Sequence, residues 1–314
     1  MLSRTEVANK PFLQFILIVC LCAISLILFS IIGLAIGLFN YELTLQKIEY
    51  MTDLNQRQVE GLKLMQLLSA IGLFLIPPLI YGMITSKKTF SKLSINQLGK
   101  PISYMLIFVL MIVSVPILSW IIEINAGMAL PDFMGGIEDW MRLQESKAQN
   151  ATNIFLTYNG IGSLIYILII VAIVPAVGEE LLFRGVLQKI FIQWTKNIHW
   201  GIWITAFLFS ALHMQFFGFI PRMLMGAVFG YIFLWSKSLW LPILAHFINN
   251  ASVVLLTYFT PEFMEDSEVS IFAESEYSYA YYFVSLVLTL GVIFLIRKLY
   301  KQKNGNNQEL LNEL

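Results

Sequence analysis

The sequence is short of charge. Only 13% of its 314 residues are Asp, Glu, Lys or Arg, against about 25% in ordinary soluble domains. Hydrophobic residues make up 58% of the chain, and the mean hydropathy is +0.73. This composition excludes an ordinary soluble domain. It predicts an all-α fold, a polytopic membrane helix bundle, because a helix satisfies its own backbone hydrogen bonds inside lipid.

Cysteine and histidine are scarce as well. The two cysteines, Cys20 and Cys22, are two residues apart on an expected helix, where side chains point apart, so we predict no disulfide between them. Only three histidines occur. The chain also lacks internal repeats and an HExxH pattern, which argues against a transporter with two related halves and against a zinc-binding pair on one helical turn.

Long apolar runs divide the chain into segments. A bilayer core of about 30 Å needs roughly 20 apolar residues per helix. By this measure we predict about eight transmembrane helices, at residues 12–39, 63–85, 102–124, 161–190, 199–216, 220–236, 238–259 and 280–298.

Lysine and arginine orient these spans. With the N-terminus in the cytoplasm, most of the 20 Lys and Arg residues fall in cytoplasmic segments and the acidic 260–279 loop lies outside, so both termini are predicted to be cytoplasmic. We treat residues 1–314 as one membrane domain with its functional core at 160–260. Residues 40–62 and 126–160 are the predicted extracytoplasmic connectors. The second connector is either an amphipathic helix at the interface or an ordinary solvated segment.

Ionisable residues inside an apolar span are costly and mark functional sites. Glu179, Glu180 and Arg184 all lie in the run 161–190. Glu180 and Arg184 are four residues apart on one helix face, which predicts an ion pair, and such a pair can be a structural support only. Glu179 has no partner at that spacing, so it is the candidate for chemistry.

Polar residues also fall in two later spans. His213 follows Phe209 by four residues, and Asn250 follows His246 by four, so each pair shares a helix face. A single histidine in an apolar helix usually packs and hydrogen-bonds a neighbour. An unpaired glutamate, two histidines and an asparagine on three spans together indicate an acid–base site.

These residues form three motifs in chain order. The motifs are Glu179-Glu180-Leu-Leu-Phe-Arg184, Phe209-Ser-Ala-Leu-His213 and His246-Phe-Ile-Asn-Asn250. They resemble the EExxxR, FxxxH and HxxxN motifs of the CPBP intramembrane protease family, which contains CAAX-prenyl endopeptidases of the Rce1 type and bacteriocin-processing (Abi) or immunity proteins. The resemblance covers roughly residues 160–260. It implies an integral membrane endopeptidase, and we expect a bacterial plasma membrane location.

The resemblance also implies a role for each residue. Glu179 activates water as a general base, and His213 holds that water or helps to deprotonate it. His246 and Asn250 donate hydrogen bonds to the oxyanion of the tetrahedral intermediate. The supporting residues are Glu180, Arg184 and Phe209.

Metal dependence is an open alternative. Glu179, His213 and His246 are the residues that a zinc ion would use, with one position left for water. An imidazole nitrogen bound to zinc cannot also serve an oxyanion, and Asn250 beside His246 suits hydrogen bonding better than zinc binding. The metal-free mechanism is therefore favoured, and we expect no cofactor.

The leading hypothesis is an endopeptidase that cuts a membrane-associated or lipid-modified peptide, of CAAX type or bacteriocin-related. The alternatives are a zinc-dependent version of this hydrolase, a proton-coupled transporter that uses the same residues as a relay, and a non-catalytic immunity or scaffold protein. The expected partners are membrane lipid and a membrane-associated peptide substrate, with no nucleic acid. The sequence leaves the oligomeric state and the physiological substrate open.

Overall fold

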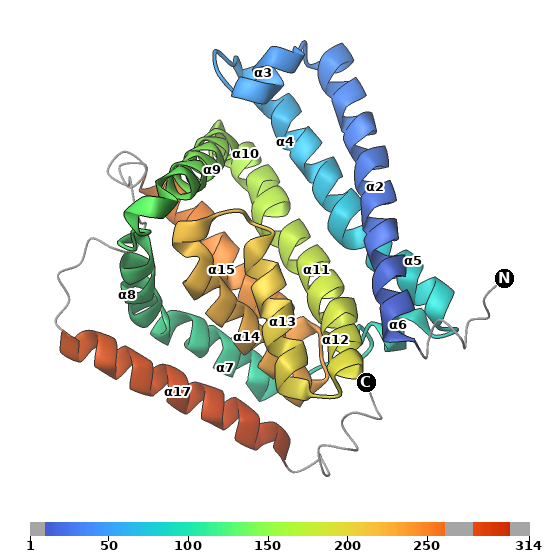
Figure 1. Cartoon of the computed structure of the whole chain (residues 1–314), viewed down its shortest axis with the longest axis vertical. Helices are drawn as coiled ribbons and strands as arrows, with labels where there is room; N and C mark the ends of the chain where they lie inside the picture. Colours follow the sequence, from blue (N-terminus) through green and yellow to red (C-terminus); the bar gives the residue numbers. More distant parts are fainter. Residues whose placement is uncertain (1–9, 261–278, 302–314) are drawn as a thin grey trace.

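The computed structural model describes residues 10–260 and 279–301, and all regular secondary structure in these ranges is helical (Figure 1). The α-helices are α2 (Pro11–Asn40), α3 (Leu45–Tyr50), α4 (Gln56–Ala70), α5 (Ile76–Thr85), α6 (Thr89–Lys92), α7 (Pro101–Val113), α8 (Val115–Ala126), α9 (Gly135–Phe155), α10 (Gly160–Ile167), α11 (Val174–Glu180), α12 (Gln188–Thr195), α13 (Ile198–Ala211), α14 (Phe219–Ser236), α15 (Trp240–Phe259) and α17 (Tyr279–Lys301). The π-helical turns are η1 (Ile71–Leu75), η3 (Leu168–Ile173) and η4 (Leu181–Leu187), and the 3₁₀ turns are η2 (Asp132–Met134) and η5 (Phe216–Gly218).

The predicted polytopic helix bundle is confirmed, with a correction to the number of spans. Six helical segments in the described residues are long and apolar enough to cross a membrane, and the pair α7–α8, bent by 45°, makes a seventh. The predicted span 199–216 corresponds to α13, which has 14 residues. A helix of that length is about 21 Å long, shorter than a hydrocarbon core of roughly 30 Å. Hydropathy overestimated this span because the apolar run continues after the helix has ended.

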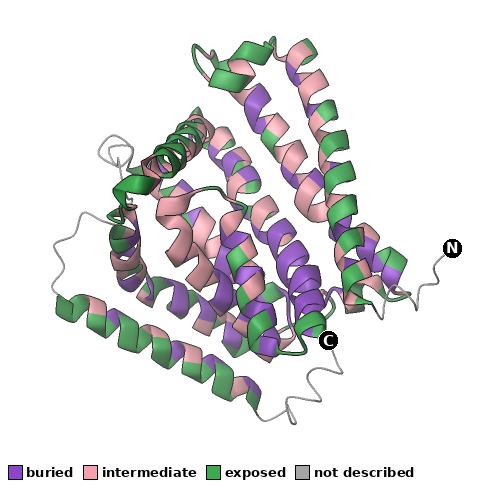
Figure 2. Ribbon diagram, viewed as in Figure 1, coloured by how far each residue is buried: buried purple, intermediate pink, exposed green. Residues whose placement is uncertain are grey.

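One long helix forms the centre of the molecule. The segments α10, η3, α11, η4 and α12 follow one another without a break over Gly160–Thr195. Every residue from 178 to 192 is buried, whereas most apolar side chains of α2 and α17 are exposed or half-buried (Figure 2). Exposed apolar faces on helices of spanning length suit contact with lipid. The glutamate pair therefore lies in the protein interior, and α2 and α17 provide lipid-facing surface.

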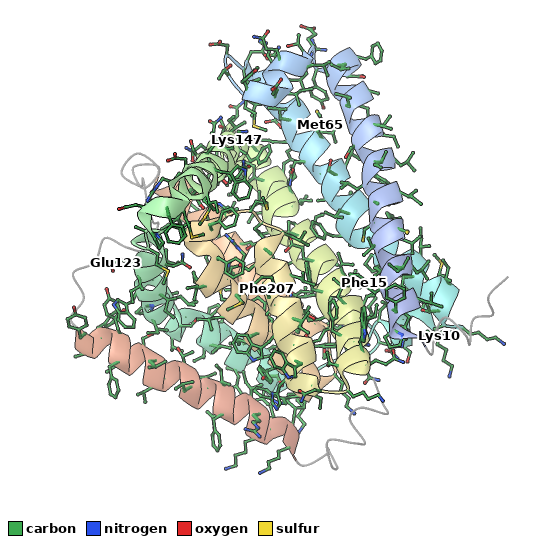
Figure 3. All side chains as sticks on the ribbon, viewed as in Figure 1. Lys10, Phe15, Met65, Glu123, Lys147 and Phe207 are labelled. Carbon is green, nitrogen blue, oxygen red and sulfur yellow. The ribbon has the colours of Figure 1, made fainter. Side chains whose placement is uncertain are left out.

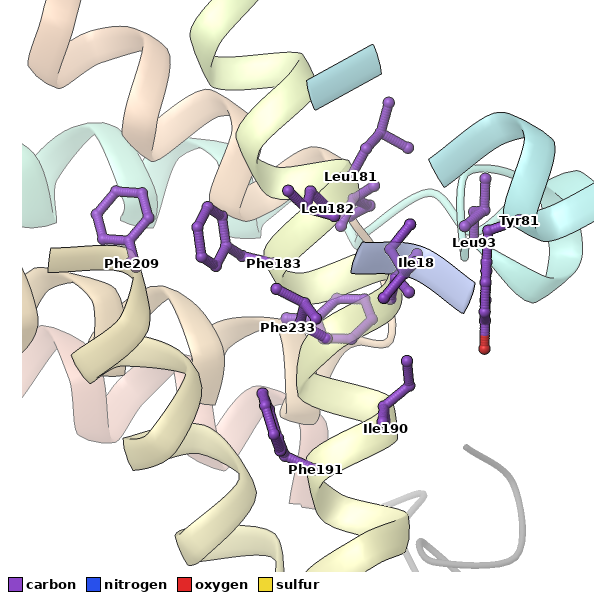
Figure 4. Close-up of a cluster of buried hydrophobic side chains, with 13 residues drawn as sticks. Ile18, Tyr81, Leu93, Leu181, Leu182, Phe183, Ile190, Phe191, Phe209 and Phe233 are labelled. Atoms are coloured by element: carbon purple, nitrogen blue, oxygen red, sulfur yellow. The ribbon is translucent and has the colours of Figure 1, made fainter. Parts of the chain in front are cut away.

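Apolar packing fixes the central helix against its neighbours. The cluster drawn in Figure 4 joins Phe183 and Ile190 of the central helix to Ile18 of α2, Phe209 of α13 and Phe233 of α14. Interdigitated side chains of this kind leave the helix little freedom to rotate. Glu179 and Glu180, immediately before η4, are thereby held at a fixed orientation.

Capping residues set the turn that joins α12 to α13. Lys196 adopts a left-handed conformation, with φ of 53°, and ends α12. The next residue, Asn197, accepts a hydrogen bond from the backbone N–H of Trp200 and so starts α13. This short connection brings α13 back alongside α12 and leads it toward the glutamate pair.

The second predicted connector contains a helix. α9 has 21 residues and no buried residue, so this segment is helical, and its location at the membrane interface stays a prediction. Figure 3 shows Lys147 on α9 and Lys10 below α2 toward opposite ends of the molecule, with Phe207 of α13 between them. Residues 1–9, 261–278 and 302–314, which include most of the acidic loop and both termini, lie outside the described residues. The predicted orientation stays a prediction.

Candidate active site

Glu179 and Glu180 lie where an α-helix changes into a π-helical turn. Glu179 and Glu180 are the last residues of α11, and Arg184 lies in the π-helical turn η4 that follows. π-helical turns are rare and occur frequently at functional sites. Such a turn contains one extra residue, which changes the side chains that share a helix face. The π-helical turn η4 therefore sets the directions of the side chains that follow Glu180.

Glu180 and Arg184 form a buried ion pair, as the four-residue spacing predicted. Arg184 Nη1 lies 2.7 Å from Glu180 Oε1, and both side chains have an exposed fraction of 1% or less. Arg184 Nη2 also donates to the carbonyl oxygen of Gly226 at 2.9 Å. The guanidinium lies 5.0 Å from the ring centroid of Phe209 and 5.7 Å from that of Phe229. A buried charge pair persists only when each ion is compensated in this way.

Glu179 has a different environment from its neighbour. The residue is 8% exposed, and its Oε2 is buried with no hydrogen-bond partner in the described part of the chain. The nearest cationic or basic side-chain atom recorded for this oxygen is Nε2 of His246, at 3.9 Å. A buried carboxylate oxygen without a donor is costly and is found where a ligand or a reaction requires it.

His246 connects the two glutamates. Its Nδ1 donates a hydrogen bond to Glu180 Oε1 at 3.0 Å, while Nε2 faces Glu179. Because Nδ1 carries a proton, Nε2 of a neutral ring has a lone pair, and Nε2 donates a hydrogen bond only in the doubly protonated imidazolium. The role that the resemblance implies for His246, hydrogen-bond donation to an oxyanion, therefore requires the charged ring.

His213 lies just beyond α13 rather than within it, because the helix ends at Ala211. Its Nδ1 donates to the carbonyl oxygen of Phe209 at 2.8 Å, which leaves the Nε2 lone pair of the neutral ring for a water molecule. The ring centroid of Phe209 is 5.1 Å from that of His213 and 5.9 Å from that of His246. Phe209 thus packs against both histidines. The structure therefore brings the second motif, which ends at His213, next to the third, which begins at His246.

Asn250 is the most peripheral of the predicted site residues. Its Nδ2 donates to the carbonyl oxygen of Val171 in η3 at 3.0 Å, and its Oδ1 accepts from Asn249 Nδ2 at 3.1 Å. An amide nitrogen has two donors, so one N–H of Asn250 remains for another acceptor. Asn250 lies one turn from His246 on α15, and the π-helical turn η3 provides the carbonyl that orients it.

The matches to known proteins centre on this group of helices. Residues 161–252 match the family model described as type II CAAX prenyl endopeptidase Rce1-like. The chain carries an Rce1-like domain. The resemblance seen in the three motifs is therefore confirmed for the segment that contains all of them.

Two proteins of Bacillus subtilis (strain 168) are similar to part of this chain. The uncharacterized protein YpbD is 33% identical over 88 residues, which are 27% of this chain and 42% of that protein. The putative membrane peptidase YdiL is 27% identical over 89 residues, which are 28% of this chain and 36% of that protein. The chain thus spans less than half the length of these relatives. No solved structure matches it significantly.

Arg222 is a neighbour of the Rce1-like site that the motifs did not reveal. This residue of α14 interacts electrostatically with Glu179 and with Glu145 of α9. Its Nη2 donates to Gln215 Oε1 at 2.9 Å. In the sequence it appeared as an ordinary cation at the end of a span. Only the packing of α14 in the bundle brings its charge within electrostatic range of Glu179.

The side chains of the Rce1-like domain do not form a zinc site in this arrangement. His246 Nδ1 bonds Glu180 and His213 Nδ1 bonds a backbone carbonyl. Across the described residues, no group of three His, Cys, Asp or Glu side chains is arranged to hold a metal ion. Zinc requires three such ligands about 2 Å from one point. No step of the mechanism below uses a metal.

An apolar cavity borders the Rce1-like site. It has a volume of about 510 Å³ and lies between α7, α15 and the part of the central helix that precedes Glu179. Ala176 and Val177 line it from α11, and Ile243 and Phe247 line it from α15. Ala176 is four residues before Glu180, and Phe247 follows His246, so the cavity is lined by the same two helices that carry these residues, although neither side chain lines it.

Proposed function

We propose that this chain is an intramembrane endopeptidase that hydrolyses a peptide bond of a membrane-associated or lipid-modified peptide. The observation that carries the proposal is the contrast within the glutamate pair. Glu180 is held through Oε1 by Arg184 and His246, whereas the carboxylate of Glu179 accepts no hydrogen bond from the described residues, although the second oxygen of each glutamate is buried without a donor. The Rce1-like domain over residues 161–252 supports a membrane protease as the reaction class. The proposed location is a bacterial plasma membrane.

In the proposed reaction Glu179 acts as the general base. It takes a proton from a water molecule that the Nε2 lone pair of His213 helps to hold, and the water oxygen attacks the carbonyl carbon of the peptide bond. The electron pair of the carbonyl bond moves to oxygen and gives a tetrahedral oxyanion. Glu179 then passes its proton to the leaving amine as the C–N bond breaks, which yields a carboxylic acid and an amine.

The proposed oxyanion donors are His246 and Asn250. His246 as an imidazolium donates from Nε2, while its Nδ1–H is held by Glu180 Oε1 at 3.0 Å, which fixes the orientation of the ring. Asn250 donates with the N–H that Val171 does not use. The Glu180–Arg184 pair is a positioning element in this scheme, because it fixes His246 and does not touch the reacting atoms.

The apolar cavity supports a substrate with a hydrophobic portion. A volume of about 510 Å³ lined by Ala, Val, Ile, Leu, Tyr, Phe and Trp side chains accommodates a lipid chain or several apolar side chains. A CAAX-type or bacteriocin-related peptide has this character. Purified full-length protein in detergent, incubated with matched prenylated and unmodified peptides, distinguishes these two classes by cleavage rate.

Replacing the base tests the proposal most directly. We expect Glu179→Gln to lower the cleavage rate by about 10²–10⁴-fold, because a general base contributes that much. His213→Ala should also lose most activity, while Glu123→Gln, at an exposed glutamate on α8, serves as the matched control. If Glu179→Gln still cleaves at the wild-type rate, Glu179 is not the general base. Proton-coupled flux across liposomes without any cleavage would favour a transporter.

Metal dependence has a separate test. We expect purified active protein to contain no stoichiometric zinc and to keep its cleavage rate in the presence of a chelator. Elemental analysis and the rate, measured on the same preparation, provide the readout. Stoichiometric zinc whose removal abolishes cleavage and whose return restores it would establish the zinc-dependent alternative.

A further inference from the structure

A basic pocket lies outside the Rce1-like site. It has a volume of about 670 Å³ and is lined by the α5–α6 segment, by α12 and by the C-terminal end of α14. The lysines that line it are Lys87, Lys88, Lys92, Lys189 and Lys237. Its other lining residues within the described ranges 10–260 and 279–301 are serines, one glutamine and one phenylalanine, without a carboxylate. α6 and α12, which contribute to it, lie toward the lower right of the molecule as drawn in Figure 1.

The lysines come from three segments that are far apart in the sequence. Lys87 and Lys88 follow α5, Lys92 ends α6, and Lys189 and Lys237 are about 100 and 150 residues further along the chain. Among the described residues, no carboxylate lines the pocket beside Lys87, Lys88, Lys92 and Lys189, and these like charges repel one another. Burial lowers the pKa of Lys92 below its usual range, because removal of the ammonium from water disfavours its charged form. Folding has brought these charges together at a cost.

Lys189 is the centre of the cluster. The residue is 8% exposed, and its Nζ donates to the carbonyl oxygen of Lys92 at 2.7 Å and to Ser94 Oγ at 2.8 Å. Both acceptors are neutral, and the remaining close contact of the ammonium is the ring of Phe233, 5.4 Å from its centroid. A buried ammonium without an anionic partner is normally avoided. The arrangement suits an anion that enters the pocket and accepts several N–H hydrogen bonds at once.

We propose that this pocket binds a phosphate group, and that the headgroup of an anionic membrane lipid supplies it. A phosphate has several strong acceptor oxygens and a negative charge, which matches a ring of ammonium and hydroxyl donors. The lysines follow directly on the spanning segment that ends at Thr85, at the depth where headgroups lie. Basic pockets between membrane helices are recognised sites for anionic headgroups.

The proposed site is physically linked to the glutamate pair. Lys189 belongs to the same uninterrupted helix as Glu179 and Glu180, and it anchors that helix to the segment after α6. A headgroup that bridges Lys189 to Lys87 and Lys88 would strengthen this anchor. The proposal does not depend on the peptidase reaction, because binding is measured without cleavage.

Lipid binding to the full-length protein tests the proposal. Native mass spectrometry and the midpoint of thermal unfolding are measured in micelles that contain phosphatidylglycerol or phosphatidylcholine. The pocket variant is Lys87→Gln/Lys88→Gln, and the matched control is Lys10→Gln/Lys196→Gln, at two exposed lysines that do not line the pocket. We expect phosphatidylglycerol to bind and stabilise the wild type, and its affinity to fall roughly tenfold or more in the pocket variant only.

A comparison with inorganic phosphate shows whether the bound phosphate group comes from a lipid headgroup or from a soluble ligand. Stabilisation by phosphatidylglycerol but not by millimolar inorganic phosphate identifies a lipid headgroup. Stabilisation by inorganic phosphate that is lost in Lys87→Gln/Lys88→Gln upholds the phosphate site and assigns a soluble ligand. Equal affinity for the two lipids, or an equal loss of phosphatidylglycerol affinity in the pocket and control variants, overturns the proposal. The lysines would then serve only to orient the protein in the membrane.

Discussion

Glu179 and Glu180 are adjacent residues with the same chemistry, but their surroundings differ. Glu180 accepts from Arg184 and from His246 through one oxygen, Oε1, so its negative charge is balanced inside the protein. Glu179 Oε2 has no donor among the described residues and faces His246 Nε2 at 3.9 Å. A charge that is balanced by a fixed partner stabilises structure, whereas an unbalanced one is available for proton transfer.

This difference predicts opposite effects of two conservative substitutions on stability. Glu180→Gln leaves the fully buried guanidinium of Arg184 without a counter-charge, which in other buried pairs costs about 3–5 kcal/mol of unfolding free energy. Glu179→Gln removes a charge that lacks a partner, so stability should stay the same or rise. The midpoint of thermal unfolding in detergent is the measurement. Equal destabilisation by the two substitutions would contradict the division of roles.

At the residue scale the sequence predicted contacts along one helix better than contacts between helices. The Glu180–Arg184 pair follows from four-residue spacing and was found as expected. The hydrogen bond from His246 to Glu180 and the approach of Arg222 to Glu179 join residues far apart in the chain. No local pattern specifies such contacts, because they depend on the rotation and depth of each helix in the bundle.

At the scale of helices, hydropathy located the elements well and their ends poorly. Each of the eight predicted segments contains helix, yet α13 stops at Ala211, five residues before the predicted end. The apolar residues that continue past this point form a turn that carries His213 and leads to η5. The π-helical turns η3 and η4 also escaped prediction, since a change of helical pitch leaves the apolar composition unchanged.

The contact between α12 and α13 depends on a glycine. A Cβ placed on Gly201 would lie 2.6 Å from the backbone nitrogen of Ile192 and 2.8 Å from its Cα, and backbone atoms cannot move aside cheaply. We expect Gly201→Ala to destabilise the protein by about 1–3 kcal/mol through overpacking. The control is Gly291→Ala in α17, where nothing lies within 4 Å of the new Cβ.

The two substitutions should therefore differ in sign. Gly291→Ala is expected to leave stability unchanged or to raise it by up to about 1 kcal/mol, because alanine favours a helix more than glycine does. Thermal unfolding of both variants in the same detergent provides the comparison. If Gly201→Ala matches Gly291→Ala, the close approach of α12 and α13 is not part of the folded protein.

At the scale of the whole molecule, a buried helix with the polar site is surrounded by helices that expose apolar side chains. Residues 178–192 are buried throughout, whereas only 11% of the most apolar part of α2 and 17% of that of α17 are buried. This distribution is the reverse of that in a soluble protein, because apolar side chains form the surface and the polar candidate site lies in the interior. It does not determine which end faces the cytoplasm.

Orientation rests on the lysine and arginine distribution and has its own prediction. After replacement of Cys20 and Cys22 by alanine, a single cysteine is placed at Lys147 on α9 or at Lys196 in the α12–α13 turn, both exposed. We expect an impermeant maleimide to label position 147 in intact cells and position 196 only after permeabilisation, because the positive-inside rule places the α12–α13 turn in the cytoplasm. The reverse pattern would invert the topology and put the basic pocket on the outer side. Labelling of both positions in intact cells would mean that the central helix does not cross the membrane between them, since both sites would then lie on one side.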